Sequence, residues 1–259
     1  MNTTVDIPIP SHESHQNKFG TLLMGIIIII LIITMVLAAW YAWAYASTPN
    51  NLHKPTSAHY HFRLQIINND QPINFADPAF QTPYDKFNCS VALPEEPIHF
   101  HDNLDQFVHI HWQGITGGML LKQYGWNEIG GSNNKLGYRF DQGRWPKTIK
   151  THGSILPQRP NSASYYLYTG DKTAHQLRNW QDFLHQDLEI FFANSLSTST
   201  ESSSPSITSS TTASNPNLVL LNHLIGNAVL FVQKNPPSEE QVQKYFNQLI
   251  PLPESTCGG

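Results

Sequence analysis

The chain of 259 residues contains few charged residues and few cysteines. Asp, Glu, Lys and Arg make up 13% of the sequence, against a usual share of about 25%. The formal net charge of -4 excludes a generally basic nucleic-acid-binding protein, so we expect no specific nucleic-acid partner. The two cysteines, Cys89 and Cys257, are too few for a disulfide-rich scaffold or a four-thiolate zinc site. The 13 histidines are therefore the main chemical resource of the chain.

A long apolar segment, residues 21–46, contains no formally charged side chain. About 20 apolar residues suffice to cross a bilayer core. Aromatic residues gather at the end of the segment, between Trp40 and Tyr45, where they favour the lipid headgroup level. A cleaved signal peptide has a shorter apolar core preceded by positive residues, whereas Lys18 is the only Lys or Arg before this segment. The sequence therefore predicts an uncleaved transmembrane helix over residues 21–46.

The placement of basic residues predicts how this helix is oriented. Lys18 closely precedes the span, and the first Lys or Arg after it is Lys54. The positive-inside rule then makes residues 1–20 a short cytoplasmic tail. We expect everything after the span to lie outside the cytoplasm of a single-pass protein of the cell membrane. In that oxidising location Cys89 and Cys257 would form a disulfide.

Composition divides the remaining chain into four parts. Residues 47–58 have the Pro, Asn and Ser of a short linker, and residues 59–194 hold most of the aromatic residues and can bury a core. Residues 195–216 are almost purely Ser and Thr, which is typical of a disordered tract. Residues 217–259 predict a core strand or short helix, followed by an amphipathic helix capped by Ser238 and packed on the domain.

The pattern within residues 59–194 predicts strands, hairpin turns and one short central helix. Strands are expected at residues 59–67, 72–75, 98–101, 107–112, 165–168 and 188–193. Residues 116–124 predict the helix, with Met119 and Tyr124 on its apolar side. Strands at both ends with a helix between them indicate a small α+β domain of β-hairpins.

Three His-x-His pairs stand in these predicted strands. The six histidines are His59, His61, His99, His101, His109 and His111. Residues i and i+2 of a strand point to the same face, so each pair can bind one ion through two nitrogens. If residues 102–106 form a hairpin loop, His99 faces His109 and Pro97 faces His111. All the histidines of that hairpin then lie on one face.

Such an imidazole cluster predicts a transition metal, zinc or copper. Residues 59–121 carry seven acidic and two basic side chains, which attracts cations. We expect His99, His101 and His109 at the centre of one metal site, with the remaining three histidines completing it or lying next to it. Two other interpretations stay open. The cluster could be a pH-sensitive group, since histidine titrates near neutral pH, or a polar strand face of a structural surface protein without metal.

Two functional classes follow from a metal site. The first is a non-enzymatic cell-surface module that binds the metal for acquisition, sensing or delivery. The alternative is a metal-dependent surface enzyme, with an open coordination position and Asp102 or Glu96 as acid or base. A separate basic segment, residues 122–178, could bind an anionic wall polymer, lipid headgroups or single-stranded nucleic acid. The simpler interpretation is a solvated region that balances the acidic segment.

The motifs also stand in a distinctive order. H-x-H, I-H-F-H-D, V-H-I-H, a short helix ending in Y-G-W, Y-Y-L-Y-T-G-D and L-E-I-F-F follow one another. This order resembles a family of membrane-anchored prokaryotic proteins with a His-rich extracytoplasmic domain, to which no reaction is assigned. The resemblance covers residues 59 to about 194, and it implies functional positions at His59, His61, His99, His101, Asp102 and His109. His111 stands where that family tends to have Glu, which keeps a possible metal ligand.

Overall fold

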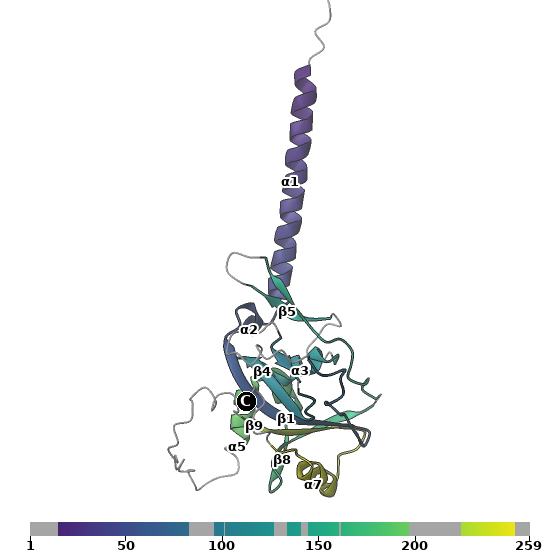
Figure 1. The fold of residues 1–259 in the computed structure, drawn as a ribbon. Coiled ribbons are helices and arrows are strands. Elements are labelled where there is room, and N and C mark those ends of the chain that lie inside the picture. The colour runs from purple at the N-terminus through teal and green to yellow at the C-terminus, as the bar shows by residue number, and fades with distance from the viewer. Residues whose placement is uncertain are drawn as a thin grey trace, which may run out of the picture. The chain divides into compact units, whose positions relative to one another are not determined.

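The computed structural model describes residues 15–82, 96–100, 102–126, 134–140, 145–160, 162–196 and 224–251. The chain divides into two compact units, residues 1–47 and residues 48–259. The first unit contains the helix α1 (His15–Ala46), drawn in purple in Figure 1. Its part Gly20–Ala46 is long and apolar enough to span a membrane. The predicted apolar helix is thus present, and its orientation stays a prediction.

The second unit is built around a mixed sheet. Among the described residues it has seven strands, six of them in the order β3-β4-β1-β9-β7-β8. The strands are β1 (Ser57–Asn68), β2 (Gln71–Pro72), β3 (Ile98–His99), β4 (Phe107–Trp112), β7 (Ser164–Gly170), β8 (His175–Arg178) and β9 (Leu224–Gln233). The central strands β1 and β9 run parallel to each other, while the other neighbours run antiparallel. A separate two-stranded sheet joins β5 (Lys135–Arg139) and β6 (Lys147–Lys150).

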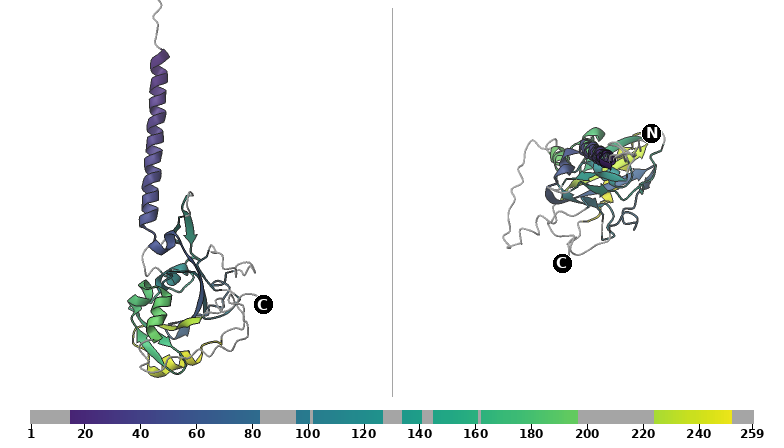
Figure 2. Two further views of the ribbon diagram at one scale, coloured as in Figure 1. Left: turned by 90° about the vertical axis from the view of Figure 1, so that its left-hand side faces the viewer. Right: turned by 90° about the horizontal axis from the view of Figure 1, so that it is seen from above.

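Short helices accompany the sheet. They are α2 (Asn50–His53), α3 (Gly117–Gln123), α4 (Trp180–His185), α5 (Leu188–Leu196) and α7 (Glu239–Asn247). The left view of Figure 2 shows the green helices α4 and α5 beside the strands, and α7 in yellow at the bottom of the view. Leu52 and His53 of α2 are buried, so this part of the expected linker is packed into the domain.

The two faces of the sheet are buried by different elements. On β1 the even-numbered residues Tyr60, Phe62, Leu64 and Ile66 belong to the main core, together with apolar side chains of α3, α4 and α5. The odd-numbered Ile67 belongs to a second, smaller cluster with Val229 and Phe231 of β9 and with the apolar face of α7. Because strand residues alternate in direction, the histidines at odd positions of β1 share the face of Ile67.

The C-terminal helix forms where the sequence predicts it. The Ser238 hydroxyl accepts a hydrogen bond from the backbone of Gln241, and the Gln241 side chain accepts one from the backbone of Ser238. This capping box satisfies two amide groups at the helix start. Val242, Tyr245 and Phe246 are buried, as the amphipathic pattern indicates.

One predicted strand is wrong. Residues 188–193 were expected as a strand, and they form most of the helix α5. The Asp187 side chain accepts a hydrogen bond from the backbone of Glu189 at 2.7 Å, as a helix cap does. Phe191 and Phe192 are buried while Ile190 is 57% exposed. A short apolar run does not by its period distinguish a buried strand from a helix.

Two further predictions differ in extent. The strand expected at residues 72–75 is reduced to β2, whose Pro72 pairs with Ile67. The strand expected within residues 217–233 is β9, and it lies in the middle of the sheet, parallel to β1. The Ser/Thr tract lies outside the described residues apart from its first two, which end α5.

Candidate metal centre

Two neighbouring strands carry four of the histidines. His59 and His61 lie on β1, and His109 and His111 lie on β4. The two strands are antiparallel, and their register places His61 directly opposite His109. Since i and i+2 residues of a strand point the same way, all four side chains lie on one face of the sheet.

The strand β3 adds a fifth histidine to this face. His99 lies opposite His109, and the backbone amide of His111 donates to the carbonyl of Pro97 at 2.9 Å. These pairings agree with the hairpin register expected from the sequence. We name the surface formed by His59, His61, His99, His109 and His111 the histidine face.

The imidazoles of the histidine face are buried. His109 has an exposed fraction of 0%, and His59, the most exposed of the five, reaches 9%. Burying polar rings is costly unless their nitrogens bind hydrogen-bond partners or a metal. A strand face that served only to fill space would favour apolar residues.

The nitrogens come close enough to share an ion. The ligand atoms of His59, His61 and His109 all lie within 4.8 Å of one another, and the rings of His61 and His109 are 4.4 Å apart, edge to face. Beside this triad, the Nε2 atoms of His99 and His111 are 3.2 Å apart. The ring of His111 is also 4.7 Å from that of His59. The five imidazoles therefore form one continuous group.

The side chains next along the face are an aromatic ring and a guanidinium group. Phe107 lies 5.2 Å from His61 and 5.6 Å from His109, measured between ring centroids. Arg63 lies opposite Phe107 on β1 and donates from Nη1 to the Asn227 side-chain oxygen at 2.8 Å. Burial lowers the pKa of Arg63 below its ordinary value. An apolar ring beside the imidazoles limits the access of water to a bound ion.

This geometry suits a transition-metal ion. Imidazole nitrogen is a ligand for zinc, copper, iron and nickel, and the usual bond from zinc to nitrogen is about 2.0–2.1 Å. Three protein ligands leave one position of a tetrahedral ion open. That position can take water, one of the neighbouring imidazoles, or a group from another molecule.

Among the described residues the triad includes both histidines of β1. The expected centre was His99, His101 and His109, of which His101 is not described, and the described triad within ligand distance is His59, His61 and His109. The reason is that β1 lies directly beside β4, so both histidines of β1 reach the same part of the face. His101 lies outside the described residues, as do Cys89 and Cys257.

The two carboxylates considered as acid or base lie elsewhere. Glu96 accepts a hydrogen bond from the Thr82 hydroxyl at 3.0 Å and lies 3.6 Å from the imidazole of His152. Asp102 is exposed in a turn, with a φ of 63°. Sequence reasoning missed the partners of Glu96, because Thr82 and His152 come from distant segments without a shared motif.

Part of the basic segment, residues 135–139 and 147–150, forms the two-stranded sheet. In the sheet of β5 and β6, Lys135 lies opposite Lys150 and Arg139 lies opposite Lys147. Like charges directly opposite each other weaken strand pairing. The partner of this segment stays a prediction.

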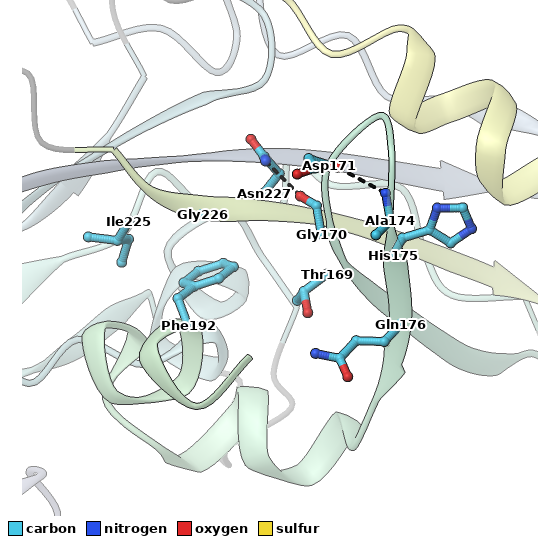
Figure 3. Close-up of a pocket in the computed structure, with 10 residues that line it drawn as sticks. All are labelled: Thr169, Gly170, Asp171, Ala174, His175, Gln176, Phe192, Ile225, Gly226 and Asn227. Carbon is cyan, nitrogen blue, oxygen red and sulfur yellow. Dashed lines mark hydrogen bonds between the residues drawn. The ribbon is translucent and has the colours of Figure 1, made fainter. Parts of the chain in front are cut away.

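A further pocket of about 260 Å³ lies between the β7–β8 hairpin, β9 and α5. Figure 3 shows the Thr169 hydroxyl and the Gln176 amide on one side of it and the Phe192 ring beneath Gly226 on the other. Asn227 donates to the Gly170 carbonyl at 2.7 Å and so ties β9 to the hairpin. The pocket contains none of the histidines of the histidine face.

No family model, no curated protein and no solved structure matches the chain. The resemblance of the histidine motifs to membrane-anchored prokaryotic proteins therefore stays a prediction. The geometry of the histidine face is the basis for a functional assignment.

Proposed function

We propose that the protein is a single-pass membrane protein whose extracytoplasmic domain binds one transition-metal ion, zinc or copper, on the histidine face. The observation that carries this proposal is the triad of His59, His61 and His109, whose ligand atoms lie within 4.8 Å of one another. The three residues come from two neighbouring strands of the central sheet. Strands hold ligands more precisely than loops do, so the site is organised before the metal arrives.

The surroundings of the triad favour binding over catalysis. A hydrolytic metal site needs a general acid or base within hydrogen-bond reach of the reacting group. The metal-ligand group found among the described residues consists of three histidines, and Glu96 contacts Thr82 and His152 instead. We therefore assign the site to metal acquisition, sensing or delivery.

Metal binding is tested on the full chain in detergent micelles after treatment with a chelator. Zinc and copper are titrated in separate calorimetric experiments, and bound metal is measured by elemental analysis. We expect the wild type to bind zinc or copper stoichiometrically, and the double variant His61→Gln, His109→Gln to bind one equivalent less. Glutamine keeps a polar side chain of similar size but lacks the imidazole ligand.

A matched control removes two histidines outside the face. His175 contacts Glu239 and Phe246, and His185 is exposed at the end of α4. The variant His175→Gln, His185→Gln should bind zinc or copper as the wild type does. A wild type without bound metal, or full binding by His61→Gln, His109→Gln, would contradict the proposed function.

The membrane orientation is tested separately with a reporter fused after Gly259 and active only outside the cytoplasm. The apolar helix Gly20–Ala46 makes the anchor, and Lys18 before it predicts a cytoplasmic N-terminus. We expect reporter activity outside. Activity of a cytoplasmic reporter at the same position would show that the predicted orientation is reversed.

A further inference from the structure

A polar pocket of about 250 Å³, distinct from the histidine face, lies where β3, α3 and β6 come together. It is lined by Glu96, Gln123, Thr148, Lys150, Thr151 and His152. Thr82 contacts two of these side chains from the end of its own segment. Its backbone amide donates to the Phe100 carbonyl at 2.8 Å, which holds it beside the chain that follows β3.

Three polar atoms converge at this pocket. The Thr82 hydroxyl oxygen lies 3.0 Å from Glu96 Oε2 and 3.3 Å from His152 Nε2. His152 Nε2 and Glu96 Oε2 are 3.6 Å apart. Three atoms at these separations lie on a circle of about 1.9 Å radius, so one point lies about 2.0–2.1 Å from all of them, a usual length for a zinc bond to nitrogen or oxygen.

The imidazole is fixed from two directions. The ring of His152 stacks on the buried ring of Tyr124, with centroids 5.1 Å apart and planes inclined by 10°. Its backbone amide donates to the Gln123 carbonyl at 2.9 Å. A metal-binding histidine is usually oriented by such neighbouring contacts.

A buried amide supplies an independent observation. Gln123 lines the pocket and is 1% exposed, and its side-chain Oε1 atom forms no hydrogen bond with any described residue. Buried carbonyl oxygens are nearly always paired, and an exception indicates a function or a ligand. An amide oxygen is an acceptor that suits a cation.

We propose that Thr82, Glu96, Gln123 and His152 form a second cation site, which takes a divalent ion that accepts both imidazole and oxygen ligands, such as Mn²⁺ or Zn²⁺. Carboxylate and carbonyl oxygens suit manganese, and imidazole suits zinc. The site differs in ligand chemistry from the all-imidazole triad on the histidine face. The second site can therefore be tested independently of the function proposed above.

The opposite charges of Glu96 and Lys150 at the pocket allow binding of a cation to be distinguished from binding of an anion. Glu96 supplies a negative charge, and its Oε2 atom lies 3.6 Å from His152 Nε2. Lys150 is exposed and lines the same pocket. A bound cation is repelled by the Lys150 ammonium group, whereas a bound anion would be attracted by it.

The test uses the full chain in detergent with the histidine face disabled by His61→Gln and His109→Gln. Mn²⁺ is titrated into this chelator-treated protein, and free Mn²⁺ is followed by electron paramagnetic resonance. We expect one equivalent to bind. Adding Glu96→Gln should weaken Mn²⁺ binding at least tenfold, and Thr82→Val, a second variant of similar shape, should weaken it as well.

Two controls keep the test specific. Glu239 contacts His175 at 2.7 Å, with a side chain that is 82% exposed. Glu239→Gln removes the same charge from another His–Glu pair and should leave Mn²⁺ binding unchanged, and Lys150→Gln should leave it unchanged or tighten it. Absence of Mn²⁺ binding, equal losses in the Glu96 and Glu239 variants, or weaker binding in the Lys150 variant would overturn the proposal.

Discussion

Gly226 on β9 is a position where a single methyl group should destabilise the sheet next to the histidines. It lies opposite Phe62 of β1 and directly over the ring of Phe192 from α5 (Figure 3). A Cβ atom added at Gly226 would lie 2.3 Å from Cδ1 and 2.9 Å from Cε1 of that ring. Carbon atoms pack at about 3.5–4.0 Å, so Gly226→Ala forces the Phe192 ring to move by about 1 Å or more.

The ring has little room to move. Phe192 is 1% exposed, and its ring lies 5.3 Å from that of Phe62 and 5.2 Å from that of Phe191. Overpacking of this kind costs about 1–3 kcal/mol, and the lower backbone entropy of alanine returns about 0.5–1 kcal/mol. We expect Gly226→Ala to lower the free energy of unfolding by about 1–2 kcal/mol, which is a fall in Tm of roughly 2–8 °C for a unit of this size.

The cause is tested by shortening the partner. Urea unfolding of the full chain in detergent is followed by tryptophan fluorescence for the wild type, for Gly226→Ala, for Phe192→Leu and for the double variant. Leucine removes the part of the ring that the new methyl group meets. The double variant should be more stable than the sum of the single changes predicts, by at least about 0.5 kcal/mol. A neutral Gly226→Ala, or strictly additive effects, would refute the reasoning.

Three further changes probe the fold at other points. The buried Tyr60 hydroxyl forms no hydrogen bond with the described residues, and burial raises the pKa of its phenol. Tyr60→Phe should therefore leave the free energy of unfolding unchanged or raise it by about 1 kcal/mol in urea titrations. Ser238→Ala removes the hydroxyl of the capping box with Gln241 and should cost about 1 kcal/mol in the same assay; a neutral result would contradict the role of the cap. Hydrogen bonds from Thr173, first among several, lower the pKa of Asp171. A lowered pKa in the folded state means that this contribution to stability is present above the ordinary aspartate range and is lost as the pH falls through the folded pKa. Asp171→Asn should therefore make unfolding less dependent on pH at the acid end, and an unchanged acid limb would exclude the carboxylate as a source.

Individual helices and strands could be predicted because the sequence patterns that indicate them lie within a few neighbouring residues. The apolar run of α1, the Ser238 cap of α7 and the alternation of β1 each act over one element. The pairing of His99 with His109 was also within reach, because a short loop between two strands fixes their register.

The long-range arrangement could not be predicted in the same way. The parallel pairing of β1 with β9 joins His61 to Leu224, and no turn connects two strands so far apart in the chain. The cluster of Thr82, Glu96 and His152 likewise draws on three separate segments. Alternation shows that His59 and His61 share a face, but only the strand order places His109 beside them. This is why the sequence named these histidines but did not single out the trio of His59, His61 and His109.

The odd-numbered positions of β1 change character along the strand, and this change links the fold to the function. At one end Ile67 is buried against α7, and the Gln65 amide donates to the Tyr245 carbonyl at 3.1 Å. At the other end the same face carries the imidazoles of His59 and His61 instead of apolar side chains. Imidazoles add less to stability by burial than apolar side chains do, because their nitrogens must be satisfied. An ion bound to ligands from both β1 and β4 would join the two strands, so part of its binding energy becomes stability of the sheet.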